Sequence, residues 1–101
     1  KKVHKFKSNN TKVPLVGSRK LIINQMYKED KIFKDMNSDS FFYFFHSYYI
    51  DVDSKYELAK TYHGDTAFSS VVKKDNIYGF QFHPEKSRKD GLTLISNFLN
   101  L

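Results

Sequence analysis

The stretch that decides the fold is residues 77–85, Ile-Tyr-Gly-Phe-Gln-Phe-His-Pro-Glu. Large apolar residues alternate along it with smaller or polar ones, which is the pattern of a β-strand with one buried face. That face would carry three aromatic side chains, Tyr78, Phe80 and Phe82. His83 lies on the other face, and Pro84 cannot donate a backbone hydrogen bond. The strand is therefore predicted to end at His83 and to lead into a loop.

The end of this strand could carry chemistry. Residues two apart in an extended backbone point to the same side, so the side chains of His83 and Glu85 would start about 6.5–7 Å apart, within hydrogen-bonding reach of each other. A carboxylate bonded to one ring nitrogen fixes the tautomer and leaves the other nitrogen to take and return a proton. The alternative is that His83 merely ends the strand and Glu85 is a solvated loop residue. Spacing alone leaves both interpretations open.

The residues before this stretch predict a sheet. Runs rich in aromatic and β-branched residues predict strands over 3–6, 21–27, 41–50, 58–62 and 67–72. Residues 41–50, Phe-Phe-Tyr-Phe-Phe-His-Ser-Tyr-Tyr-Ile, form the central strand of this prediction. Turn residues separate the later runs, so neighbouring strands are expected to pair antiparallel. Between 28 and 40 the chain is polar, and we expect a helical turn or loop packed by Ile32, Phe33 and Met36.

The residues after it predict a helix that runs to the end of the chain. Leu92, Ile95, Phe98 and Leu99 recur at helical spacing. Ser87, with Asp90 three residues later, resembles a capping box, so Lys86 and Ser87 are interpreted as loop and helix-start residues. Gly91 is expected to weaken the helix by about 1 kcal/mol relative to alanine.

Composition limits the classes of protein. The 101 residues allow one domain or part of one, and 17 Lys and Arg against 11 Asp and Glu give a net charge of +6. The absence of cysteine excludes a disulfide scaffold, a thiolate zinc site, a zinc deaminase and a cysteine nucleophile within these residues. No apolar run approaches the ~20 residues of a membrane span.

The aromatic and histidine content also bears on two other classes, nucleic-acid-binding modules and metal-binding proteins. A basic sheet with many aromatic residues could bind nucleic acid by base stacking, but the aromatic residues of 41–50 would occupy both faces of the strand. Core packing explains them better, and a nucleic-acid-binding β module is kept as the alternative. The histidines are not at the short helical spacing of a metal site, so no metal is expected.

Four segments, taken together, resemble a known family: 44–49 (Phe-Phe-His-Ser-Tyr-Tyr), 68–71 (Phe-Ser-Ser-Val), 78–87 (Tyr-Gly-Phe-Gln-Phe-His-Pro-Glu-Lys-Ser) and 91–99, with its Gly-Leu and Asn-Phe-Leu. In order and spacing, essentially the whole chain resembles the C-terminal half of the glutamine amidotransferase subunits of imidazole glycerol phosphate synthase. His-Pro-Glu alone marks the wider class I, or triad, amidotransferases.

The resemblance implies an α/β fold, the C-terminal part of a flavodoxin-like mixed sheet with an antiparallel extension and a final helix. It implies a glutaminase reaction in which a cysteine thiolate attacks the glutamine amide, His83 protonates the departing ammonia and activates water, and Glu85 orients His83. It also implies that Ser47 and Tyr48 bind L-glutamine, although Tyr48 could equally serve the core.

The resemblance further implies that the ammonia passes to a cyclase subunit in a cytoplasmic heterodimer of histidine biosynthesis. No cofactor, nucleic acid or membrane is implied. Residues 1–101 would be the C-terminal portion of the domain, and the N-terminal half would carry the nucleophilic cysteine. We therefore expect these residues alone not to hydrolyse glutamine.

One segment departs from the family pattern. Residues 13–19, Val-Pro-Leu-Val-Gly-Ser-Arg, stand where the family has Pro-His-x-Gly-Trp-Asn, near the partner face. Pro14 and Gly17 match, but the His, Trp and Asn do not. An amidotransferase subunit that feeds an enzyme modifying surface-polysaccharide sugars is therefore the second hypothesis for the acceptor.

Overall fold

The computed structural model describes residues 3–6, 13–37 and 40–101. Its strands are β1 (Val3–Lys5), β2 (Leu15–Lys20), β3 (Ile22–Ile23), β4 (Phe41–His46), β5 (Tyr48–Ile50), β6 (Glu57–His63), β7 (Thr66–Lys74) and β8 (Ile77–Phe80). Its α-helix is α1 (Arg88–Leu99), and single 3-10 turns are η1 (Gln25–Tyr27), η2 (Lys31–Phe33), η3 (Ser54–Tyr56) and η4 (Pro84–Lys86).

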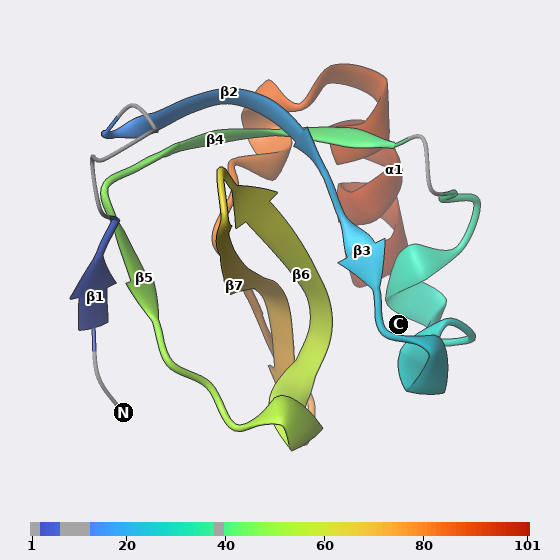
Figure 1. Ribbon diagram of the computed structural model, residues 1–101. Coiled ribbons are helices and arrows are strands. Elements are labelled where there is room, and N and C mark those ends of the chain that lie inside the picture. The colour runs from blue at the N-terminus through green and yellow to red at the C-terminus, as the bar shows by residue number, and fades with distance from the viewer. Residues whose placement is uncertain (1–2, 7–12, 38–39) are drawn as a thin grey trace.

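The described strands form three antiparallel sheets (Figure 1). β1 pairs with β5, β2 pairs with β4, and a four-stranded sheet has the order β3-β6-β7-β8. In Figure 1, β2 and β4 cross above the β6–β7 hairpin, and α1 lies behind the right-hand part of these two strands. The antiparallel pairing and the final helix are confirmed, and the chain is a mixed α/β structure. The parallel pairing that the resemblance implies is not formed between the described strands.

The prediction of one central strand over residues 41–50 is wrong. The run divides at Ser47 into β4 and β5, which pair with different partners. The backbone carbonyl of Ser47 accepts a hydrogen bond from Phe6 at 2.9 Å, and the ring Nδ1 of His46 contacts the carbonyl oxygen of Tyr48, also at 2.9 Å. These contacts hold a bend that the aromatic composition of the run does not indicate.

The sequence prediction also missed β2 and overextended the strand that follows it. β2 contains Gly17 and three polar or charged residues, which obscure the strand pattern, yet it pairs with β4 along its whole length. The strand predicted over 21–27 shrinks to Ile22–Ile23. Asn24 ends it, because its side chain accepts a hydrogen bond from the N–H of Met26 and starts η1.

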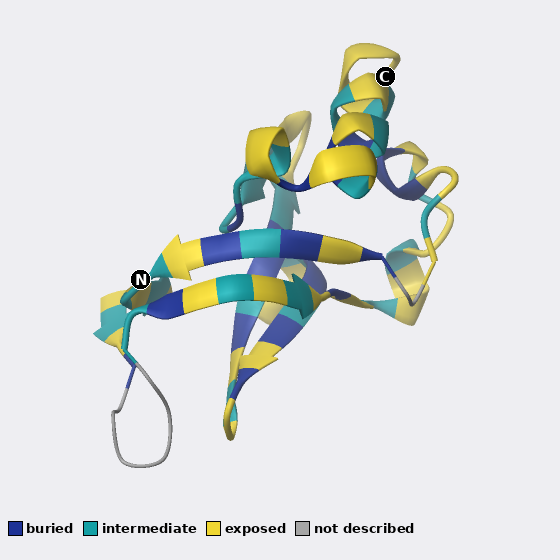
Figure 2. Cartoon of the chain, turned by 90° about the horizontal axis from the view of Figure 1, so that it is seen from above, coloured by how far each residue is buried: buried dark blue, intermediate teal, exposed yellow. Residues whose placement is uncertain are grey.

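Core packing accounts for half of the aromatic run. Phe42 and Phe44 are fully buried, whereas Phe41 and Phe45, on the other face of β4, are 45% and 55% exposed. This alternation is visible along β2 and β4 in Figure 2. The buried set also includes Phe6, Leu15, Leu58, Phe68, Val71, Phe82 and Leu94. The strands and α1 therefore share one core.

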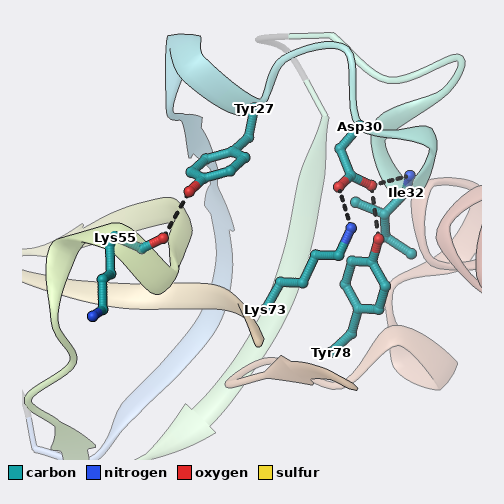
Figure 3. Close-up of polar contacts among 6 residues, drawn as sticks. All are labelled: Tyr27, Asp30, Ile32, Lys55, Lys73 and Tyr78. Carbon is teal, nitrogen blue, oxygen red and sulfur yellow. Dashed lines mark hydrogen bonds and ion pairs between the residues drawn. The ribbon is translucent and has the colours of Figure 1, made fainter. Parts of the chain in front are cut away.

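The loop between β3 and β4 packs as predicted, with Ile32 and Phe33 buried in η2. Asp30, just before η2, ties this loop to the β7–β8 hairpin (Figure 3). Its carboxylate accepts hydrogen bonds from the N–H of Ile32 (2.9 Å), the ammonium of Lys73 (3.0 Å) and the hydroxyl of Tyr78 (2.9 Å). Burial raises the pKa of Asp30, but these three bonds outweigh it and hold the pKa below its ordinary value.

The predicted capping box at the start of α1 is wrong, although the helix begins where expected. Ser87 occupies the N-cap position but makes no side-chain hydrogen bond to the helix. The carboxylate of Asp90 accepts instead from the N–H of Phe41, at 2.9 Å, and so attaches α1 to the start of β4. Gly91 has a packing role: a Cβ at this position would lie 1.9 Å from the carbonyl oxygen of Pro84. Only glycine lets α1 approach η4 so closely.

Candidate functional site

The His-Pro-Glu segment follows β8 directly. β8 ends at Phe80, three residues before the predicted end at His83, and His83 then forms an isolated antiparallel bridge with Tyr43 of β4. The rings of Tyr78, Phe80 and Phe82 do lie along one side, as the alternation predicted, with Tyr78 stacked on Phe80 and Phe80 tilted against Phe82. Pro84 begins η4, which contains Glu85. The histidine therefore stands where the sheet gives way to a helical turn.

His83 and Glu85 contact each other, as their spacing predicted. Nδ1 of His83 lies 3.1 Å from Oε2 of Glu85. Because a carboxylate accepts, Nδ1 carries the proton, and Nε2 is the nitrogen that can take up another. The two side chains are 41% and 60% exposed, so a substrate or a second chain could reach them.

The charge of Glu85 suits an orienting role. Its own backbone N–H donates to the carboxylate and lowers the pKa of Glu85 below its ordinary value, and the hydrogen bond from His83 lowers it further. Glu85 is therefore ionised at neutral pH, as an acceptor facing a histidine requires.

The structure does not bring Ser47 and Tyr48 to His83. Tyr43 is the residue of β4 opposite His83, and Ser47 is four residues further along the chain, roughly 13 Å at the rise of a strand. Both candidates instead belong to the bend after His46, and the Tyr48 side chain is 54% exposed. Its exposure shows that Tyr48 is not a core residue.

His46 is partly buried, and one of its ring nitrogens is fully buried, a feature that sequence reasoning left unassigned. Its Nδ1 must donate to the carbonyl of Tyr48, since a carbonyl only accepts. Its Nε2 is buried, with no hydrogen-bond partner among the described residues. Burial lowers the pKa of His46 below its ordinary value, the bond to Tyr48 opposes this, and the nearby His63 and His83 lower it further. A neutral His46 thus maintains the bend that presents Ser47 and Tyr48.

Sequence reasoning also missed a second histidine–carboxylate pair. Nε2 of His4, in β1, lies 2.7 Å from a carboxylate oxygen of Asp51, just after β5. The partners are 47 residues apart, so no local motif signals them. Only the pairing of β1 with β5 brings them together.

A hollow of about 540 Å³ opens beside Tyr43. Phe41 and Tyr43 of β4 contribute aromatic surface to it, Gly17 and Ser18 of β2 form another side, and Lys86, Arg88 and Lys89 add positive charge. It therefore combines part of the divergent segment 13–19 with the residues that follow His-Pro-Glu.

The described parts of the chain contain neither a metal-binding cluster nor a membrane-spanning helix. In the ranges 3–6, 13–37 and 40–101, no three histidine or acidic side chains are grouped as metal ligands. Nor does any helix in those ranges have the length and apolar character needed to cross a bilayer.

Comparison with known proteins identifies the family. The model of the class-I glutamine amidotransferases matches residues 3–101. A protein of Buchnera aphidicola subsp. Schizaphis graminum named "Imidazole glycerol phosphate synthase subunit HisH" is 43% identical over 97% of this chain and 47% of its own length. Relatives of the same name from Archaeoglobus fulgidus and Methanocaldococcus jannaschii are 41% and 40% identical over 99% and 98% of this chain, and over 49% and 48% of their own lengths.

The chain thus spans about half the length of the curated relatives it matches. The matched range includes every segment on which the resemblance was based, so the resemblance is confirmed. This chain belongs to the class-I glutamine amidotransferase family.

Proposed function

We propose that this chain supplies the acid–base half of a glutaminase site, which hydrolyses L-glutamine to glutamate and ammonia. One observation carries the proposal: in the His-Pro-Glu motif of a class-I family member, Nδ1 of His83 lies 3.1 Å from Glu85. This contact leaves Nε2 of His83 for proton transfer and keeps the ring oriented.

The proposed reaction needs a cysteine thiolate from residues outside this sequence. The thiolate attacks the side-chain amide carbon of glutamine, and the protonated Nε2 of His83 gives its proton to the departing nitrogen, which leaves as ammonia. His83 then takes a proton from water, the resulting hydroxide attacks the thioester, and glutamate is released with the thiolate restored. Throughout, the negative charge of Glu85 stabilises the protonated imidazole.

Ser47 and Tyr48 are proposed to bind glutamine in this reaction. The half-exposed side chain of Tyr48 and the bend held by His46 support an accessible binding segment. Because this segment lies some distance from His83 along β4, it would contact the amino-acid end of the substrate, with the amide end near His83. Tyr48→Phe and Ser47→Ala are expected to raise KM more than they lower kcat.

The ammonia is proposed to pass to a cyclase subunit in the cytoplasm, as the family resemblance implies. The three relatives described above are each named as a subunit of imidazole glycerol phosphate synthase, which supports an assembly with a second subunit. The hollow beside Tyr43, with its three basic residues, is the proposed contact surface. Lys86→Glu with Lys89→Glu should weaken subunit binding by tenfold or more, and high salt should weaken binding of the unmodified protein. Binding only to an enzyme that modifies polysaccharide sugars would favour the second hypothesis for the acceptor.

The test of the activity uses two proteins, the chain alone and a chimera. In the chimera, the first half of the Buchnera relative precedes this chain, and glutamate and ammonia release are measured. We expect activity from the chimera and none from the chain alone. A chimera that folds and binds glutamine but releases no ammonia contradicts the proposal, and so does an active chimera that keeps its rate after His83→Ala.

A further inference from the structure

The backbone contact between Tyr43 and His83 is an unusual antiparallel bridge. In a regular hydrogen-bonded pair of this kind, the two residues exchange two N–H···O bonds. The first is present, because the N–H of His83 donates to the carbonyl of Tyr43 at 2.9 Å. The second would run from the N–H of Tyr43 to the carbonyl of His83.

A serine hydroxyl occupies the place of that second bond. The N–H of Tyr43 donates to Oγ of Ser87 at 2.9 Å, and Oγ donates its proton to the carbonyl of His83 at 2.7 Å. A hydroxyl has one proton to donate, so its donor capacity is used up in this relay. Ser87 is 7% exposed, and water has little opportunity to replace it.

The relay determines the direction of the His83 backbone. The inserted hydroxyl links the His83 carbonyl to the N–H of Tyr43 in β4. The same carbonyl also accepts from the N–H of Lys86 at 3.0 Å, which closes η4 around Pro84 and Glu85. One carbonyl orientation thus sets both the Cα–Cβ direction of His83 and the turn that carries its carboxylate partner.

The surroundings of Ser87 leave little freedom. Its N–H donates to the carbonyl of Pro84, and its carbonyl accepts from the N–H of Gly91. Because α1 packs directly on η4 at Gly91, Ser87 is held from both sides. Its hydroxyl makes no bond to the start of α1, where a residue serving only as a helix cap would direct it.

We propose that Ser87 is a positioning residue for His83: its hydroxyl, inserted between the N–H of Tyr43 and the carbonyl of His83, aims the imidazole at Glu85. The catalytic meaning of this role rests on the proposed function, but the placement itself does not. Without the hydroxyl, either Tyr43 and His83 bond directly and the imidazole turns, or the N–H of Tyr43 stays unsatisfied and the segment loosens.

The test measures the tautomer of His83 by nitrogen-15 NMR in the full chain, without glutamine or a nucleophile. In the unmodified chain the Nδ1–H form should dominate. Ser87→Ala should shift His83 toward the Nε2–H form that free histidine favours, in the same direction as Glu85→Gln. The exchange of the Tyr43 amide with solvent should become at least tenfold faster.

Ser70→Ala is the matched control, since Ser70 is also buried, at 1% exposure against 7% for Ser87, but its hydroxyl has no hydrogen-bond partner among the described residues. It should leave the His83 tautomer unchanged. Ser87→Cys, which is similar in size but a weaker donor, should give an intermediate tautomer if Ser87→Ala fails to fold.

A folded Ser87→Ala or Ser87→Cys chain with the unmodified tautomer overturns the proposal. So does a Ser87 hydroxyl proton that exchanges at the solvent rate in the unmodified chain, a measurement that needs no variant. An inactive chimera would contradict the proposed function and leave these tautomer results standing, so the two failures are distinguishable.

Discussion

Two exposed histidine–carboxylate pairs lie within the described residues. His4–Asp51 joins β1 to the residue after β5, at 2.7 Å, and His83–Glu85 joins the end of the β8 segment to η4, at 3.1 Å. The exposures of the side chains are similar, 38% and 64% in the first pair against 41% and 60% in the second. By distance and exposure alone, the first pair would be the better candidate.

The two pairs differ in how firmly the backbone of the histidine is held. His83 is fixed at its N–H by Tyr43 and at its carbonyl by Ser87 and Lys86. Pro84, which lies between the two partners, restricts the backbone there. His4 belongs to a strand of only three residues, and the His4 ring stacks on the ring of Tyr49. A histidine–carboxylate distance therefore does not define a proton-transfer site, and the rigidity of the backbone that presents the two groups is the better criterion.

The largest expected effect separates the pairs by activity. In the chimera, His83→Ala should lower kcat about 10²- to 10⁴-fold, the usual contribution of a general acid–base group. His4→Ala should leave kcat within about twofold, because its ring is not part of the proposed site. Ammonia release under saturating glutamine measures both. Equal losses of kcat in the two variants would show that the two pairs do not differ in their contribution to the reaction.

Replacing the carboxylates gives a smaller contrast. Glu85→Gln should lower kcat about 10- to 100-fold, less than for a buried triad carboxylate because solvent can partly orient an exposed ring. Asp51→Asn is the matched change in the other pair and should have no effect on kcat. Since the pKa of Glu85 is lowered, activity should not depend on its titration at or above its ordinary pKa of 4.5. A fall in kcat centred above pH 5 that disappears in Glu85→Gln would contradict this assignment.

Gly91→Ala tests the packing of α1 on η4, the turn that carries Glu85 of the second pair. The added Cβ would meet the Pro84 carbonyl at 1.9 Å, so α1 or η4 must shift. Overpacking of about 1–3 kcal/mol, offset by the better helix propensity of alanine, should lower the free energy of unfolding by about 1–2 kcal/mol. Thermal unfolding measures it, with Ser96→Ala, exposed on the same helix, as the control. An unchanged melting temperature would mean that the contact relaxes without cost.

The ion pair between Lys73 and Asp30 contrasts with the two exposed histidine–carboxylate pairs, because the Asp30 side chain is only 10% exposed. Its contribution is therefore measured as stability. Asp30→Asn should lower the free energy of unfolding by about 1 kcal/mol, since the amide keeps an acceptor but loses the charge. The lowered pKa of Asp30 means that its stabilisation is present above the unfolded value, 3.8, and is lost as pH falls below it. Urea unfolding from pH 3 to 7 should show this loss in the unmodified chain and not in Asp30→Asn. Identical pH profiles would show that Asp30 contributes nothing by its charge.

Local motifs explain which parts of the candidate site were predictable. His83 and Glu85 are two residues apart, and Pro84 favours an extended backbone at His83, so their contact is predictable from spacing. The bonds that Tyr43 and Ser87 make to the His83 backbone add an orientation that spacing does not indicate. The shared aromatic face of the β8 segment follows in the same way from alternation. The hairpins of β6, β7 and β8 follow from the turn residues between them. The roles of His4, His46 and Ser87 depend on partners from other elements, and periodicity carries no information about them.

The sequence by itself determined the family, the antiparallel hairpins, the final helix and the contact between His83 and Glu85, since each depends on residue types at short spacing. The tertiary structure alone decided that the aromatic run bends at Ser47, that residues 15–20 form a strand, and that the Ser87 hydroxyl bonds to β4 and not to its own helix. The physical reason is that a buried polar group must form a hydrogen bond with a partner close to it. Where the group lies between two elements, the packing of those elements decides which partner is close.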